Sequence, residues 1–306
     1  MNKKIINNVI KKYTKNIKKY KFNKNSIIYS DDSNTYVAKE NKNDIANLYN
    51  YLNSRGFNYM PKLLYSNDYG YIYQYENNIN FECEEKISDI IKTISLLHNK
   101  TAYYKATAID EYKELYDDLN YKINDVFNYY DNILNSIESK VYMSPSEYML
   151  SRNCSSIFSA LNFCLNELNN WYEIVKDNTK TRYVLIHNNL DIDHIIKNNE
   201  TLLLSWDNSK RDYPIYDFIS LYKKNYNKCN FSPMYKEYTS RFPLLNEEKK
   251  LLFIMLFIPW KISFDECELQ NTILVSDLCN YLYETDRLFM EQQTENSNIQ
   301  DHYINE

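Results

Sequence analysis

The 306-residue sequence predicts an α+β fold in two parts, a small antiparallel sheet crossed by one helix and a larger, mainly helical part. Short strand-like runs separated by polar turns occupy the chain as far as residue 77. Beyond this point, long stretches repeat apolar residues at helical spacing. We therefore expect an N-terminal lobe over 1–77, a helical C-terminal lobe over 78–290 and a disordered polar tail over 291–306.

The N-terminal lobe is expected to follow the order strand, strand, helix, strand, strand. The segments are NSIIYS, NTYVAKE, NKNDIANLYNYLNSRGF and PKLLYSNDYGYIYQYEN. Ahead of them, residues 5–20 place apolar side chains at helical spacing, with lysines on the other face. Such a basic amphipathic helix either covers its own domain or lies on a membrane surface, and we favour the first interpretation.

The C-terminal lobe is expected to begin with the buried helix ISDIIKTISLLHNK and a long helix over 108–138. Ser144, Pro145 and Glu147 then fit a capping box that opens a helix through about residue 176. A later helix is expected to start at Asn246. Between these helices, the segment YVLIHNNLDIDHIIKNNETLLLSWDNS has two apolar runs around a polar loop. We predict a hairpin there, embedded in the helical lobe.

Composition argues against several classes of protein. The net charge of -5 makes a nucleic-acid partner a poor expectation. The longest apolar run, LLFIMLFIPW, is shorter than a membrane span, and the N-terminus is too polar for a signal peptide, so we expect cytoplasmic synthesis. The six cysteines form no CxxC pair, and we expect no metal site. With only two glycines, the chain has no glycine-rich phosphate loop.

Several motifs in order resemble the protein-kinase-like fold, and more narrowly the aminoglycoside phosphotransferase and choline-kinase-like superfamily with its CotS-like spore-coat proteins. YVAK, ending at Lys39, resembles the strand lysine that contacts the α and β phosphates. LLH, ending at His98, resembles a helix ending of this superfamily. The frame IHNNLDIDHII resembles the loop H-G-D-x-x-x-x-N, and SWDNSKRDYPIYDF resembles a following acidic stretch. The resemblance runs from about residue 24 to about residue 265.

The resemblance also implies where the chemistry has changed. Asn189 occupies the position of the aspartate that accepts the substrate proton, and an amide cannot accept it. His194 replaces a magnesium-binding asparagine, although Mg²⁺ prefers oxygen ligands. Ser205 replaces the main metal-binding aspartate. Phosphoryl transfer depends mainly on positioning and on metal-assisted charge neutralisation. Because the residues for this are changed, we assign no catalytic residue and expect no cofactor.

The remaining motif residues are expected to support the loop. His187 is interpreted as a buried brace, and Asp217 resembles a helix-start aspartate that binds the loop backbone. Lys39 is a weak nucleotide-binding candidate, either exposed or ion-paired, with Asp44 or Glu40 as possible partners. The turn YSDDSN, with its two aspartates and no glycine, would repel a triphosphate.

The resemblance implies a catalytically inactive, kinase-like protein of the bacterial spore coat, with other coat proteins as partners. The 32 tyrosines suit such a setting, because exposed phenols provide contact surface and can be cross-linked by oxidation. One alternative is an active phosphotransferase that binds ATP and Mg²⁺ through displaced aspartates, for which the candidates are Asp191, Asp193 and Asp207. Another is a sensor that binds nucleotide without metal. The oligomeric state cannot be read from the sequence.

Overall fold

The structure, a computed structural model, describes residues 3–14, 17–23, 26–32, 34–41, 43–77, 79, 81–108, 110–198 and 200–304, with side chains from residue 6 to residue 294. It contains two compact units. Unit 1 comprises Met1–Tyr103, Tyr183–Leu221 and Glu237–Phe242. Unit 2 comprises Tyr104–Arg182, Tyr222–Lys236 and Pro243–Glu306. Unit 1 is thus larger than the lobe expected over 1–77.

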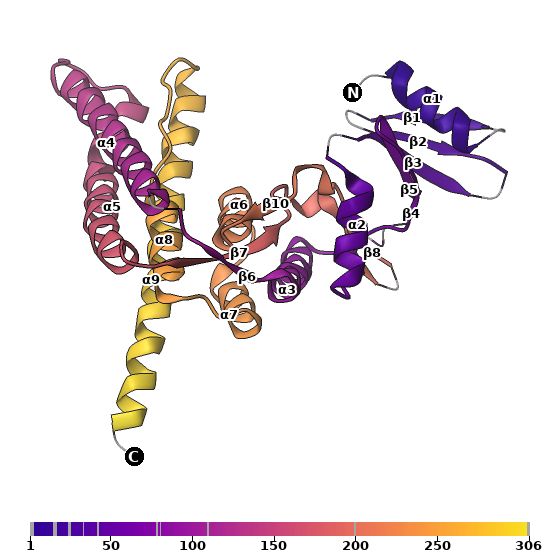
Figure 1. Ribbon diagram of the computed structural model, residues 1–306. Coiled ribbons are helices and arrows are strands. Elements are labelled where there is room, and N and C mark those ends of the chain that lie inside the picture. Colours follow the sequence, from indigo (N-terminus) through magenta and orange to yellow (C-terminus); the bar gives the residue numbers. More distant parts are fainter. Residues whose placement is uncertain are drawn as a thin grey trace. The chain divides into compact units, whose positions relative to one another are not determined.

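Unit 1 is built on a five-stranded antiparallel sheet with the strand order β1-β2-β3-β5-β4 (Figure 1). Its strands are β1 (Lys19–Phe22), β2 (Ile27–Ser30), β3 (Thr35–Glu40), β4 (Leu63–Ser66) and β5 (Gly70–Gln74). Helix α2 (Ile45–Ser54) joins β3 to β4, and Asp44 caps its first turn. The α+β fold class predicted from the sequence is confirmed. Strand β1 was not predicted.

Helix α1 (Lys3–Tyr13) covers one face of this sheet. Ile6, Val9 and Ile10 are buried in one apolar cluster with β2, β3 and β5. The helix therefore covers its own domain, as we favoured, but it ends at Tyr13 rather than near residue 20. Gly70 permits this packing, because a Cβ atom there would lie 2.8 Å from the Lys39 carbonyl oxygen and 3.2 Å from Val9.

Strand alternation directs Lys39 to the opposite face of the sheet. Tyr36 and Ala38 belong to the cluster under α1, so Lys39 points away from that cluster. Its cross-strand neighbour is Tyr71 on β5, and Ile72, the next residue, faces α1. Lys39 and Tyr71 therefore lie side by side on the face opposite α1.

The rest of unit 1 holds α3 and the loop segment that resembles a catalytic loop. Its elements are α3 (Cys83–Thr101), most of β7 (Lys180–Ile186), β8 (Ile195–Lys197), β9 (Thr201–Leu203), β10 (Lys210–Asp212) and the start of α6 (Ile215–Asn225). Two 3-10 turns, Ile192–His194 and Trp206–Asn208, interrupt the segment. The predicted hairpin is only partly correct. Strand β8 pairs with β9, whereas the preceding apolar run in β7 pairs with β10, a short polar strand without an apolar signal.

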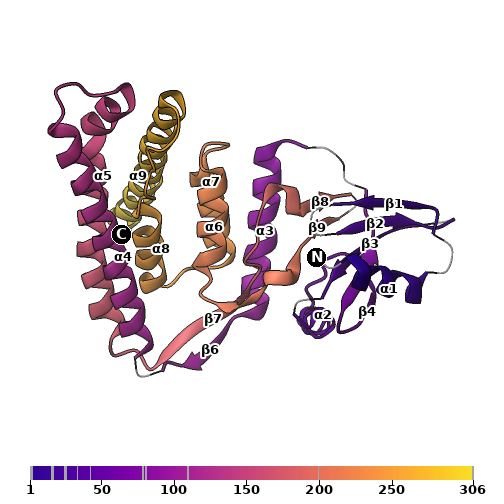
Figure 2. The ribbon, with the colours of Figure 1, turned by 90° about the horizontal axis from the view of Figure 1, so that it is seen from above.

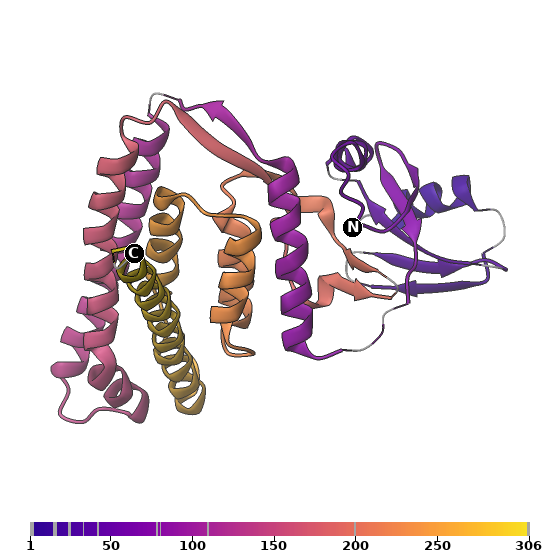
Figure 3. The same ribbon diagram turned by 90° about the horizontal axis from the view of Figure 1, so that it is seen from below.

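Unit 2 is a bundle of long helices in which α5 packs against α4, α8 and α9 (Figure 2). Its elements are β6 (Tyr103–Ala106, from its second residue), α4 (Glu111–Glu138), α5 (Pro145–Val175), α7 (Phe231–Arg241, in its first part), α8 (Asn246–Phe257) and α9 (Glu268–Ile304). Ser144 and Glu147 form the predicted capping box, with Pro145 at the first helical position. A short turn joins α4 to α5 (Figure 3).

Helix α9 extends to Ile304 and so includes most of the segment that we expected to be a disordered tail. Side chains beyond residue 294 lie outside the described residues. Among the helices of the described residues, none is long and apolar enough to cross a membrane.

Candidate functional site

The residues singled out by the motifs come together within unit 1. Lys39 lies on β3, and the loop after β7 carries His187, Asn189 and His194. Ser205 and Asp207 follow β9, and Asp217 lies in the first turn of α6; these positions belong to the same unit as the sheet. The site can therefore be described from contacts within one unit.

Asp217 holds the backbone at the start of the loop. Its carboxylate accepts hydrogen bonds from the backbone N–H of His187 and of Asn188, each at 2.8 Å. The side chain is fully buried. Asn188 has a left-handed backbone with φ of 55°, which costs free energy in a residue other than glycine. The two hydrogen bonds offset this cost and fix the shape of the loop.

His98 is the third partner of Asp217, and its Nε2 donates to the carboxylate at 3.2 Å. Its Nδ1 is 2.8 Å from the hydroxyl of Tyr238. Burial by itself raises the pKa of Asp217, but hydrogen bonds and charge from His98, together with His187, outweigh it and hold the pKa below its usual value. The carboxylate is thus kept ionised, which suits an acceptor of three hydrogen bonds.

His187 is a fixed brace. Its Nε2 donates to the carbonyl oxygen of Leu204 at 2.8 Å, and its ring packs edge-on against Trp206 at 4.7 Å. Burial lowers the pKa of His187 to about 4, so the ring is neutral near pH 7. Among the described residues, its buried Nδ1 has no hydrogen-bond partner. The ring joins the loop to the segment before Ser205.

Asn189 and His194 are bonded to each other within the loop. The Nδ1 of His194 donates to the backbone carbonyl of Asn189 at 2.7 Å. The carbonyl of His194 in turn accepts from the N–H of Leu204 at 2.8 Å. The imidazole of His194 therefore bonds to the backbone of its own loop.

Lys39 reaches the segment that follows β9. Its Nζ donates to the Ser205 hydroxyl at 2.9 Å and lies 3.3 Å from Asp207. The other carboxylate oxygen of Asp207 accepts from the Tyr71 hydroxyl at 2.7 Å. Lys39 and Asp207 are only 10% and 19% exposed, so their charges are poorly solvated and stabilise each other. Asp44, a partner suggested by the sequence, instead caps α2.

Ser205 itself has a left-handed backbone, with φ of 65°. This conformation is uncommon outside glycine and indicates that neighbouring contacts determine the chain path here. The contacts are those of Lys39 with the Ser205 side chain and of His187 with the preceding carbonyl.

The other displaced aspartates are placed differently. Asp191 caps the first 3-10 turn by accepting from the backbone N–H of Asp193, and Asp193 is exposed. Within the described residues, no group of three His, Cys, Asp or Glu side chains is arranged to hold a metal ion. In the turn that follows β2, Asp31 accepts from the Tyr36 hydroxyl at 2.9 Å, and Asp32 pairs with Lys18.

Two partners in this site were missed by sequence reasoning. Tyr71 could have been found only from the strand register, which sets it opposite Lys39. Tyr238 lies far along the chain, in α7, and carries no motif that links it to His98.

The burial of His187 predicts a pH dependence of stability. The unfolded chain takes up a proton near pH 6.5, whereas the folded chain does so only near pH 4, so stability falls as the pH is lowered through this window. Between pH 7 and pH 5, we expect His187 to contribute a loss of about 1 to 2 kcal/mol. Urea unfolding at both pH values should show a smaller loss in His187→Gln. An equal loss in the natural chain and in His187→Gln would refute the assignment.

The contact between Lys39 and Asp207 predicts energetic coupling. In a double-mutant cycle of Lys39→Met and Asp207→Asn, we expect a coupling free energy of about 1 to 2 kcal/mol, because both groups are largely buried. The exposed pair of Arg241 with Glu237 is the matched control and should couple by less than about 0.5 kcal/mol. Chemical denaturation measures both. Coupling near zero for the first pair would mean that Lys39 is not held in this contact.

The comparisons identify the fold. No protein-family model and no curated protein matches the chain. It is similar in structure to an aminoglycoside phosphotransferase from Alicyclobacillus acidocaldarius, with 12% sequence identity and a TM-score of 0.69, over 94% of this chain and 95% of that one. It is also similar to the AMP-bound spectinomycin phosphotransferase, with 13% identity and a TM-score of 0.52, over 94% and 93%. The chain therefore has the protein-kinase-like fold of these aminoglycoside phosphotransferases.

Proposed function

We propose that this chain is a catalytically inactive, kinase-like protein that acts by binding. The observation that carries the proposal is the contact of Lys39 with Ser205 and Asp207. A strand lysine that would contact phosphates is bonded to the protein at the position where a metal-binding carboxylate would be. A nucleotide would have to break this pair and leave Asp207 without its counter-charge.

The residue types at the loop support the same conclusion. Phosphoryl transfer needs the developing charge to be neutralised, mainly by Mg²⁺ held on oxygen ligands. Asn189 and Ser205 supply no anionic oxygen, and His194 supplies an imidazole already bonded to the loop. Three positions that matter to the chemistry are therefore changed, while the contacts of Asp217 that shape the loop remain.

We further propose that the protein is a component of the bacterial spore coat, with other coat proteins as partners. The support is the resemblance of its motifs to CotS-like proteins, together with its surface tyrosines. Among the described residues, nine tyrosines are exposed: Tyr13, Tyr20, Tyr69, Tyr75, Tyr104, Tyr121, Tyr142, Tyr148 and Tyr283. Exposed phenols offer rigid contact surface and can be joined by oxidation.

The alternative of an active phosphotransferase depends on Asp207, which lies beside Lys39 and two residues after Ser205. For Asp207 to bind a metal ion, it would have to release Lys39 and Tyr71. A sensor that binds nucleotide without metal would likewise have to free Lys39. Both alternatives therefore require the contact between Lys39 and Asp207 to break. They differ in whether nucleotide binding depends on a metal ion, which a binding experiment measures.

Thermal unfolding in the presence of ATP tests the proposal that the protein is catalytically inactive. We expect no shift in the unfolding midpoint of the natural chain, with or without Mg²⁺, because a ligand stabilises only a fold that it binds. A shift that requires Mg²⁺ would support the enzyme, and a shift without metal would support the sensor.

A repaired variant carrying Asn189→Asp, His194→Asn, Ser205→Asp and Asp207→Asn is the positive control, because the last change also removes the carboxylate that holds Lys39. At about a hundredfold excess of MgATP over Kd, it should gain about 2.7 kcal/mol. Adding Lys39→Ala to the repaired variant should remove this gain.

A coat role predicts where the protein accumulates. We expect it to be made during sporulation and to be recovered from the coat fraction of purified spores. Quantitative mass spectrometry of coat, core and vegetative-cell fractions measures this. Recovery from vegetative cells alone would contradict the coat role and would leave the binding proposal unaffected.

A further inference from the structure

The turn between α4 and α5 exposes an unusual run of apolar side chains. This turn, Lys140–Met143, is here called the tip. Val141 and Tyr142 are each 88% exposed, and Met143 is 39% exposed. Turns of this kind are normally polar, and adjoining apolar side chains that contact so little of their own chain indicate an interaction surface.

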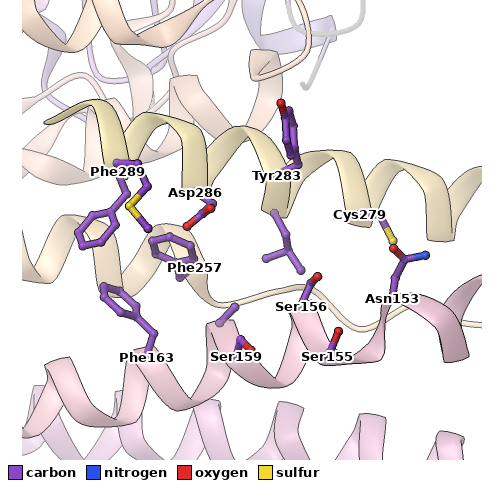
Figure 4. Close-up of a pocket in the computed structure, with 13 residues that line it drawn as sticks. Asn153, Ser155, Ser156, Ser159, Phe163, Phe257, Cys279, Tyr283, Asp286 and Phe289 are labelled. Atoms are coloured by element: carbon purple, nitrogen blue, oxygen red, sulfur yellow. The ribbon is translucent and has the colours of Figure 1, made fainter. Parts of the chain in front are cut away.

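A second feature of unit 2 is a groove of about 480 Å³ between α5, the end of α8 and α9 (Figure 4). Its aromatic wall consists of Phe163, Phe257 and Phe289, with ring centroids 4.7 to 5.7 Å apart. Ser159, an exposed residue with a small side chain, lines the groove on the side formed by α5. The groove is large enough to hold an aromatic side chain together with its apolar neighbour.

The groove also carries a negative charge. Asp286 extends from α9 toward the aromatic wall (Figure 4). Two other acids of this helix, Glu284 and Glu291, pair with Arg287. Among residues with described side chains, none forms a hydrogen bond or an ion pair with Asp286. The groove thus combines an apolar wall with a carboxylate that can accept a cation.

The tip supplies the matching chemistry. Beside its apolar side chains, the tip carries the cation Lys140. Lys140 forms an ion pair with Glu147, but the lysine side chain is exposed, so this pair is weak. The Tyr142 hydroxyl can bond to a serine of the groove. In this chain the tip is exposed and so does not fill its own groove.

We propose that the tip of one copy of the protein inserts into the groove of a second copy, with Tyr142 against the aromatic wall and Lys140 near Asp286. Tip and groove are different patches, so the contact is heterologous and each copy can use both. Such a contact builds chains or rings rather than a simple twofold dimer. This inference does not depend on the proposed function. Either proposal can be refuted without affecting the other.

The area involved indicates a weak individual contact. One buried tyrosine contributes roughly 150 to 250 Å², whereas a stable interface buries about 1,200 to 2,000 Å². The tip supplies only part of such an area, so self-association should appear at high protein concentration. A densely packed protein layer provides that condition.

Analytical ultracentrifugation of the full chain, from micromolar to near-millimolar concentration, tests the proposal. The average mass of the natural chain should rise with concentration beyond that of a dimer. A tip variant, Val141→Ser with Tyr142→Ser, and a groove variant, Ser159→Lys with Asp286→Lys, should each remain monomeric. All four positions are exposed, so circular dichroism should show the natural fold. Tyr142→Phe, which keeps the ring, should associate.

Mixing the two variants gives the decisive result. The tip variant retains a working groove and the groove variant retains a working tip, so the mixture should form dimers and nothing larger. The matched control is Tyr121→Ser, which removes a tyrosine that is 75% exposed on α4 and should leave association unchanged. A natural chain that stays monomeric would overturn the proposal and leave the groove to another occupant. Association that survives in either variant, or a mixture that stays monomeric, would also overturn it.

Discussion

The shape of the candidate site depends on one buried carboxylate. Asp217 accepts hydrogen bonds from two consecutive backbone N–H groups and from His98. These bonds hold Asn188 in a left-handed conformation and set the direction of the loop that follows β7. His187, placed by the same bonds, connects the loop to the carbonyl of Leu204. Buried groups of this kind are costly unless every partner is present, so the loop is either formed as a whole or lost as a whole.

For the inactive protein that we propose, this dependence explains how the loop keeps its shape without its chemistry. The shape of the loop comes from backbone N–H groups and from the side chains of Asp217, His98 and His187. These bonds do not involve the side chains of Asn189, His194 or Ser205. Two of these side chains also make contacts within the site. His194 bonds to the loop backbone, and Ser205 accepts from Lys39. Asp207 balances the charge of Lys39, which would otherwise be buried alone. Lys39, His194 and Ser205 are therefore each bonded to neighbouring groups of the same unit.

Much of the fold could be predicted from the sequence, because the short apolar run in TYVAKE and the Ser144 capping box are local signals. Strand β1 and the pairing of β7 with β10 were missed. Strands β1 and β10 are short and rich in charged residues, and their pairing is set by tertiary context. In the site, the resemblance of the motifs to those of the kinase-like fold indicated that Lys39, His187 and Asp217 lie in one region. It could not give Tyr71 or Tyr238, because their contacts depend on strand register and on the packing of a distant helix.

The central claim of the proposed function is that this site does not bind a metal-nucleotide complex. Electron paramagnetic resonance of Mn²⁺ with ATP tests it directly, since Mn²⁺ can occupy the oxygen-ligand sites that suit Mg²⁺ and loses its sharp solution signal when protein-bound. We predict that titrating the natural chain into Mn²⁺ and ATP leaves the signal unchanged. A signal that falls in proportion to added protein, and that recovers when excess Mg²⁺ and ATP are added, would contradict the account and restore the cleft as a nucleotide site.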